Sequence, residues 1–368
     1  MEFSKITQRT HSISAKKLSQ YPYFLSRYLQ VKLACTLANE KSGHVTKKKA
    51  RLIRAAIVEL IKENKFKLFY VDPYSGGGGI ALSTNMNEAI QKVVYKRSGV
   101  LLDRKLDINA SQSTADTCAT AFRLSLRDRV DDIQQKMIET VDILQKKSNE
   151  FKNIKITART CLQPAGPSTL GRLFKGYIGL YQRKITECDK LKKSLLEVNL
   201  GGTVFGQSDN ASKEYRALII EELRAATKLE VKKSKNFFDR AQNIDDLENI
   251  GNFINTLGST SIKFSKDLRL LSMEKESSLG VLQLYPVIPG SSFYSDKVNP
   301  TIVETFIQSC FLAKSLTQYS ELATQHGELQ LNTFEAGSYF SLVDALNYLS
   351  NGFKILNLHA LSTMTLKK

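Results

Sequence analysis

The sequence predicts an all-α protein dominated by long helices that pack at shallow angles. Three stretches carry apolar residues at steps of three, four or seven over many turns, which is the spacing of one helix face. Long seams of this kind are what a bundle of nearly parallel helices requires. The seam residues are Ile133, Met137, Val141 and Leu144; Tyr177, Tyr181, Cys188, Leu191, Leu195 and Val198; and Leu247, Ile250, Ile254, Leu257, Phe264, Leu268 and Leu271. We interpret them as core residues without a chemical role.

Composition agrees with a globular protein that buries a large core. The chain has 368 residues, 42% of them hydrophobic, and its length alone would suggest two or three domains. It contains no run of eighteen apolar residues and no charged-then-apolar signal pattern at the N-terminus, so we expect a cytoplasmic protein without a membrane partner. The five cysteines are scattered, which favours reduced thiols over a disulfide framework or a zinc site.

The net charge of +17 indicates an anionic partner, either nucleic acid or a small dianionic substrate. The basic residues occur in short groups, such as 47–49, 192–193 and 232–235, and they do not form a long basic arm. No zinc finger or RNA-recognition signature accompanies them. We therefore expect solvated helix faces and no nucleic-acid partner.

The first third of the chain reads as helices separated by polar turns. Helices are expected from about Pro22 to Ala38 and from Ala50 to Lys67, and a polar turn at 111–116 precedes a helix from Thr120 to Leu126. The glycine run at 76–79 is followed by Ile-Ala-Leu instead of Gly-Lys-Ser/Thr. This spelling argues against a nucleotide-binding P-loop.

The stretch at 289–301 reads as a mobile loop that leads into a helix. Gly290 and the serines after it give a segment of low bulk, and the apolar-periodic residues from Ile302 to Leu322 follow. Asn299 and Pro300 are expected as N-cap and first-turn residues. A helix N-terminus carries a partial positive charge and Lys297 adds a full one, so this place suits a carboxylate or phosphate.

The spelling Gly-Ser-Ser-x-x-x-x-Lys-x-Asn-Pro at 290–300 resembles the signature loop of the aspartase/fumarase superfamily, as found in class II fumarases and aspartate ammonia-lyases. Members cleave C–N or C–O bonds of succinyl-type substrates by β-elimination. Further stretches match in the order that the family uses, so the resemblance covers most of the chain. They are 83–88; 109–116 with 120–123; 158–165 with 169–171; 200–203 with Gly206; and 326–332.

The resemblance implies an architecture and partners. A homotetramer is expected in which subunits share the core of a central long-helix bundle and each active site takes loops from three chains. Residues 1–110 would form an N-terminal helical region and 111–368 the bundle domain that carries the signature loop, with the family's small C-terminal domain absent. The partner would be a small carboxylate substrate, without a metal or organic cofactor.

The resemblance also implies the site residues and their roles. Ser291 matches the base that removes the proton from the carbon next to a carboxylate. Lys297 and Asn299 match groups that stabilise the resulting doubly charged aci-carboxylate. Glu304 matches a glutamate that holds a histidine in much of the family. The predicted substrate contacts of matching type are Ser113, Thr114, Thr160 and Ser292.

Four predicted pocket positions depart from the family pattern. The family places hydroxyl side chains where Ile80 and Leu82 stand, an asparagine at Ala115, and a histidine at Cys161. A cysteine thiol cannot replace a cationic imidazole, and no histidine lies near Cys161 in sequence to activate it. We expect Cys161 to change the shape or polarity of the pocket, while covalent catalysis by its thiol stays an alternative.

These observations predict a carbon–nitrogen lyase acting on a substituted succinate or aspartate derivative, with release of fumarate or a related unsaturated acid. Cleavage of a C–N bond is favoured over a C–O bond. The alternatives are a catalytically inactive homologue with a structural or regulatory role and a basic nucleic-acid-binding protein.

Overall fold

The computed structural model describes residues 3–5, 7–8, 12–207, 209–277, 279–288 and 290–367; Pro289, at the start of the predicted loop, lies outside them. The chain divides into two compact units. Unit 1 comprises Met1–Asp128, Lys192–Ile250 and Gln318–Val343, and unit 2 comprises Arg129–Leu191, Gly251–Thr317 and Asp344–Lys368. Each unit is therefore assembled from segments far apart in sequence. The predicted division at residue 110 concerns the order of regions along the chain and stays a prediction.

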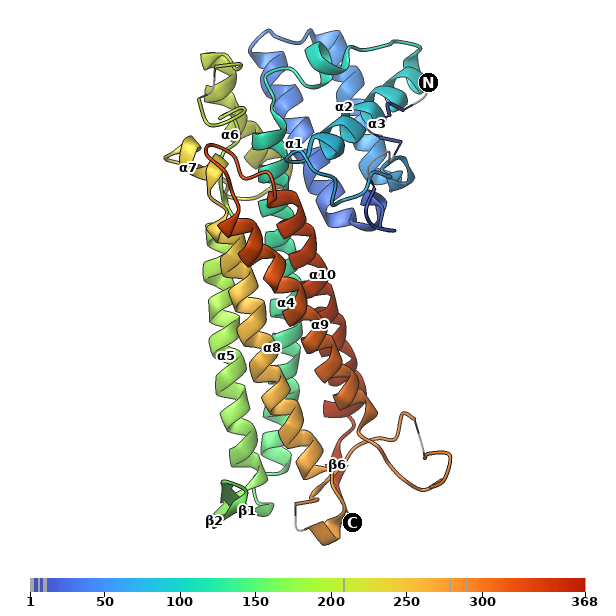
Figure 1. Ribbon diagram of the computed structural model, residues 1–368, viewed down its shortest axis with the longest axis vertical. Helices are drawn as coiled ribbons and strands as arrows, with labels where there is room; N and C mark the ends of the chain where they lie inside the picture. Colours follow the sequence, from blue (N-terminus) through green and yellow to red (C-terminus); the bar gives the residue numbers. More distant parts are fainter. Residues whose placement is uncertain are drawn as a thin grey trace. The chain divides into compact units, whose positions relative to one another are not determined.

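The structure is predominantly helical, and the prediction of an all-α fold is confirmed (Figure 1). Among the described residues, no helix combines the length and the apolar character that a membrane crossing requires. The α-helices are α1 (Pro22–Lys41), α2 (Lys47–Lys62), α3 (Ile80–Ser98), α4 (Thr114–Glu150), α5 (Leu170–Ser194), α6 (Lys213–Thr227), α7 (Phe237–Gln242), α8 (Asp245–Leu271), α9 (Thr301–Gln325) and α10 (Glu335–Leu356).

Short 3₁₀ and π-helical turns and small strand pairs connect the α-helices. The turns are η1 (Leu18–Gln20), η2 (Phe66–Leu68), η3 (Arg104–Ile108), η4 (Lys275–Ser277) and η5 (Asn357–Leu361). The strands are β1 (Lys155–Thr160), β2 (Gln163–Thr169), β3 (Glu197–Val198), β4 (Lys232–Lys233), β5 (Leu282–Gln283) and β6 (Thr365–Leu366). The pairs β1–β2 and β5–β6 are antiparallel and β3–β4 is parallel. These pairs fasten loops and do not form a separate sheet layer.

Helix ends differ from the predicted ones where polar side chains cap them. The hydroxyl of Thr46 accepts the backbone N–H of Lys49, so α2 begins before Ala50. The same helix ends at Lys62, and Asn64 follows with a left-handed φ of 46°. α4 begins at Thr114 instead of Thr120, because Ser113 and Asp116 form a capping box described below.

The core of unit 1 combines stacked aromatic rings with a buried ion cluster. Rings of Phe24 and Phe122 are 5.1 Å apart, and Phe122 lies 4.6 Å from Tyr339. Beside them, the Arg123 guanidinium pairs in bidentate fashion with Asp246 at 2.7 and 3.0 Å and reaches Glu335 at 2.6 Å.

This ion cluster joins three helices in the interior of unit 1. The side chains of Arg123, Asp246 and Glu335 are only 1%, 5% and 12% exposed. Burial raises the pKa of Glu335, and the nearby Arg123 opposes that rise. Because an unpaired charge is costly at such a depth, the cluster fixes how α4, α8 and α10 meet.

Unit 2 is a bundle in which parts of α4, α5, α8, α9 and α10 lie side by side (Figure 1). The ring centroids of Phe264 (α8) and Tyr177 (α5) are 4.6 Å apart, and those of Phe353 (α10) and Phe306 (α9) are 4.9 Å apart. The predicted seams are buried almost throughout, with Val141, Leu191 and Leu271 half-buried. The interpretation of these seams as core is therefore confirmed.

Replacing Arg123 with methionine should destabilise the protein by roughly 3–5 kcal/mol, because the buried Glu335 would lose its ion-pair partner and Asp246 would keep only its pair with Arg240 at 3.1 Å. Lys136→Met is the matched control, since it breaks a more exposed pair with Glu139 and should cost no more than about 1 kcal/mol. Urea unfolding monitored by circular dichroism measures both. Equal losses in the two variants would contradict the role assigned to the cluster.

Candidate functional site

The loop that matches the family signature is closed at its base by its own polar groups. The N–H of Gly290 donates to the carbonyl of Lys297 at 2.9 Å, and the Asn299 amide donates to the carbonyl of Gly290 at 3.2 Å. Gly290 has a φ of 72°, and a Cβ there would lie 2.7 Å from the carbonyl oxygen of Ser295. The loop therefore requires glycine at this point.

Ser291 and Ser292 lie on the exposed arm of this loop. The Ser291 hydroxyl accepts the backbone N–H of Tyr294 at 3.1 Å, and the backbones of these two residues also exchange hydrogen bonds. α9 begins one residue later than predicted, because the carbonyl of Pro300 accepts the first helical bond from Glu304. Asn299 thus closes the loop instead of lying at the cap position.

Lys297 and Asn299 line a pocket of about 440 Å³ in unit 2. Lys266 and Arg269 from the last turns of α8 line the same pocket, and the acidic group on its wall is Glu274. Arg269 also pairs with Glu304 at 3.1 Å. Three cations around a volume of this size give a place suited to a small carboxylate.

Thr160 and Cys161 lie at the tip of the β1–β2 hairpin. Cys161 and Leu162 form its two-residue turn with φ values of 51° and 62°, the backbone that a type I′ turn needs. The Cys161 thiol is exposed. The hairpin follows α4 and the signature loop follows α8, and both lie at the same end of the unit 2 bundle (Figure 1).

The remaining predicted residues gather in unit 1 at the starts of α3 and α4. Ser113 caps α4: its hydroxyl accepts the N–H of Ala115 at 3.2 Å, and its own N–H donates to the carboxylate of Asp116 at 3.0 Å. Gly79, just before α3, has a φ of 88°, and a Cβ there would lie 3.2 Å from the methyl group of Thr114. The two helix starts are therefore in contact.

The residues at these helix starts that differ from the family pattern lie in different environments. Ile80 is 52% exposed, whereas Leu82 is fully buried and packs in the core of unit 1. Ala115 is buried in the first turn of α4. The described conformation thus gives Leu82 a packing role, and its contact with substrate stays a prediction.

Sequence reasoning did not single out Asp116 as an individual residue, although it anchors the start of α4. Its fully buried carboxylate accepts the N–H groups of Ser113, Gly201 and Thr203 at 3.0 to 3.1 Å. Burial raises the pKa of Asp116 to about 7, against the lowering effect of these bonds and of Lys32. The Ser-x-x-Asp spacing of a capping box was the available signal. Lys266 and Arg269 carry no such signal.

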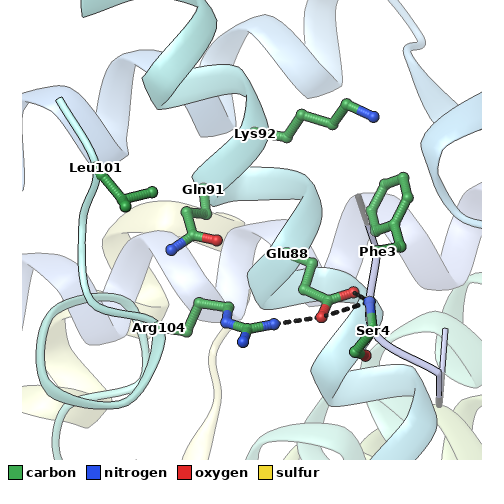
Figure 2. Close-up of a pocket in the computed structure, with 7 residues that line it drawn as sticks. All are labelled: Phe3, Ser4, Glu88, Gln91, Lys92, Leu101 and Arg104. Carbon is green, nitrogen blue, oxygen red and sulfur yellow. Dashed lines mark hydrogen bonds and ion pairs between the residues drawn. The ribbon is translucent and has the colours of Figure 1, made fainter. Parts of the chain in front are cut away.

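A second pocket, of about 310 Å³, lies in unit 1 between α3 and η3 (Figure 2). Its buried Glu88 accepts the N–H of Ser4 at 3.2 Å and pairs with Arg104, while Lys92 points away from that pair. The Glu88 carboxylate and the Arg104 guanidinium are paired with each other, and no predicted site residue lines the pocket. We interpret Glu88 as the anchor of the N-terminal segment. Within the described residues, no group of three or more His, Cys, Asp or Glu side chains is placed to hold a metal ion.

Comparison with known proteins identifies the family. The family model described as "Lyase" matches residues 3–313. The chain belongs to the aspartase/fumarase superfamily of lyases. Aspartate ammonia-lyase from Helicobacter pylori is 30% identical over 359 residues, which cover 96% of this chain and 77% of that protein. The enzyme of the same name from Corynebacterium glutamicum is 32% identical over 355 residues, covering 94% and 67%.

Solved structures of superfamily members have the same fold. The crystal structure of fumarate lyase:delta crystallin from Brucella melitensis bound to cobalt superimposes with a TM-score of 0.96 at 29% identity, covering 99% of this chain and 81% of that one. The class II fumarase from Schistosoma mansoni superimposes with a TM-score of 0.88 at 22% identity, covering 94% and 77%, and supports the fold alone. The superfamily's chemistry is β-elimination, and its members bind small carboxylates and form oligomers.

The raised pKa of Asp116 predicts a pH-dependent stability. Between about pH 4 and 7 the folded protein holds this proton more tightly than the unfolded chain, so the contribution of Asp116 to stability falls as pH rises and is constant above 7. The free energy of unfolding of the wild type minus that of Asp116→Asn should decrease over this range by at most about 4 kcal/mol. Urea unfolding at several pH values measures it. A difference that increases with pH would contradict the prediction.

Proposed function

We propose that the protein is a carbon–nitrogen lyase that eliminates an amine from an N-substituted aspartate or a related substituted succinate. The observation that carries the proposal is the cationic pocket at the start of α9, where Lys297 and Asn299 of the signature loop meet Lys266 and Arg269 of α8. Family membership supplies the reaction type.

The proposed chemistry begins with the loop serine. The ionised Ser291 hydroxyl takes the proton from the carbon next to a carboxylate, and the C–H electron pair moves into that carboxylate as an aci-form with two negative charges. Lys297, Asn299 and the N-terminus of α9 stabilise this charge. The electron pair then returns to form the C=C bond, the C–N bond to the protonated amino group breaks, and the neutral amine leaves with the electron pair of that bond.

The proposed substrate follows from the altered positions. The altered positions are Ile80, Leu82, Ala115 and Cys161, where the family places polar groups, whereas the hydroxyl pair of α4 and the signature loop keep the matching types. A charged substrate group that loses one hydrogen bond loses about 1.5–3 kcal/mol. We infer a substrate with a larger or less polar amino-linked group than aspartate or malate carries.

The site residues fall in both units, and the proposal includes a homotetramer in which loops of three chains form each active site.

A catalytically inactive homologue is the second candidate. The observation in its favour is the exposed Cys161 at the position of the family's histidine, with Glu304 paired to Arg269. The experiments below separate the two.

Ser291→Ala should lower the kcat of elimination at least about a thousandfold, because the variant has no base at the reacting carbon. The exposed loop side chain contributes little packing, so the melting temperature and the tetramer mass from light scattering should match the wild type. Ser295→Ala, an exposed serine of the same loop whose hydroxyl donates to Asp296, is the matched control and should retain most of the activity. Full turnover by Ser291→Ala would assign the base elsewhere, with Cys161 the next candidate, and a monomer in light scattering would contradict the shared site.

A substrate screen that follows fumarate release tests the proposed specificity. N-substituted aspartates should be turned over with a kcat/KM about a hundredfold or more above that for malate or aspartate. The reason is that a charged group of malate or aspartate would lose two hydrogen bonds at the altered pocket positions. Argininosuccinate is included for comparison. Efficient turnover of malate or aspartate would refute the proposal that the altered pocket positions make these compounds poor substrates. No turnover of any compound, without a ligand-induced thermal shift, would favour the inactive homologue.

A further inference from the structure

A buried lysine holds the turn that immediately precedes the Ser113–Thr114 pair. Lys32 of α1 is 1% exposed, and its ammonium donates to Asn109 Oδ1 at 2.8 Å and to Gln112 Oε1 at 2.9 Å. These acceptors are the first and last side chains of the turn. One cation therefore fixes both ends of the turn relative to α1.

The rest of the turn has a conformation that its sequence does not favour by itself. Ser111 has a left-handed φ of 58° and donates its hydroxyl to Asn39 Oδ1 at 2.7 Å. The Asn39 amide donates to the carbonyl of Ala110 at 2.8 Å. Because a serine rarely adopts this backbone without compensation, tertiary hydrogen bonds from α1 must maintain it.

The hydroxyl pair thus lies between two anchors. On one side Lys32 holds the 109–112 turn, and on the other Asp116 binds the backbone of Gly201 and Thr203. A carboxylate bound by two hydroxyl groups is sensitive to small displacements of either one.

We propose that Lys32 is a positioning residue for the lyase reaction: through the 109–112 turn it holds Ser113 and Thr114 where they receive a substrate carboxylate. This inference rests on the proposed function. Lys32 itself has no contact with substrate in this account, since it is buried beneath the turn. Its effect should therefore appear in substrate binding and not in proton removal.

The ammonium is suited to this task because its acceptors are neutral. Charge-assisted hydrogen bonds are about twice as strong as neutral ones. Burial lowers the pKa of Lys32 to about 8, which leaves the side chain mostly charged at pH 7. The Tyr28 ring, with its centroid 5.7 Å from the ammonium, adds a favourable contact on another side. A methionine of similar length would leave Gln112 Oε1 without its donor.

The test compares Lys32→Met with Thr36→Val by hydrogen–deuterium exchange of the full-length protein. Thr36 is the matched control, because it is buried one turn further along α1 and, among the residues that the structure describes, its hydroxyl bonds only to the carbonyl of Lys32. In Lys32→Met, peptides covering 105–119 should exchange at least tenfold faster while peptides of unit 2 keep their rates. Unchanged protection at 105–119, or an equal increase throughout the chain, would overturn the inference.

Kinetics and binding supply the functional readout. Lys32→Met should raise KM, and the dissociation constant of succinate used as a probe, on the order of thirtyfold, with kcat within about threefold. Thr36→Val should leave both constants unchanged. A fall in kcat with unchanged KM would overturn the positioning role. If the wild type releases no fumarate from any compound, the proposed function fails, whereas exchange and succinate binding still decide on Lys32. If Lys32→Met does not fold, Lys32→Gln, which keeps a polar but uncharged side chain at this position, should give the same localised change.

Discussion

The ion cluster around Arg123 is the interaction on which the arrangement of unit 1 depends. Its planar guanidinium meets carboxylates from two other helices in fixed directions, so α4, α8 and α10 cannot rotate or slide without exposing an unpaired buried charge. α4 also carries the capping box of Ser113 and Asp116 at its first turn. A helix held against rotation presents its first turn in one direction. The buried cluster thereby sets the direction of the Ser113 and Thr114 hydroxyl groups, the candidate contacts for a substrate carboxylate.

Both parts of the candidate site lie at the starts of helices. In each part a loop precedes the helix, and hydrogen bonds between polar groups of that loop hold it closed. Gly290, Lys297 and Asn299 bind one another across the signature loop, and the 109–112 turn is fastened to α1. The helix N-termini contribute partial positive charge, and lysine and arginine side chains contribute full charges. Succinyl-type substrates are dianions, so a scaffold of long helices with cationic ends is suited to them.

Periodicity predicted the helices well because it reflects burial within a single face. The family resemblance located the signature loop, and the structure places Lys297 and Asn299 on one pocket. Sequence could not predict Lys266 and Arg269 there, since on α8 they look like any solvated cations until the fold brings the loop beside them. It also could not separate Ile80 from Leu82, because exposure at a helix start depends on what packs over it. The end of α2 and the start of α4 were missed because capping contacts override periodicity.

The environments of the five cysteines have a practical consequence. Cys35, Cys118, Cys188 and Cys310 are buried, whereas Cys161 is exposed at the tip of the β1–β2 hairpin. A maleimide dye added to the native protein would therefore label one position per chain without any engineered residue. Fluorescence from that dye would report whether the hairpin lies in water or against another surface.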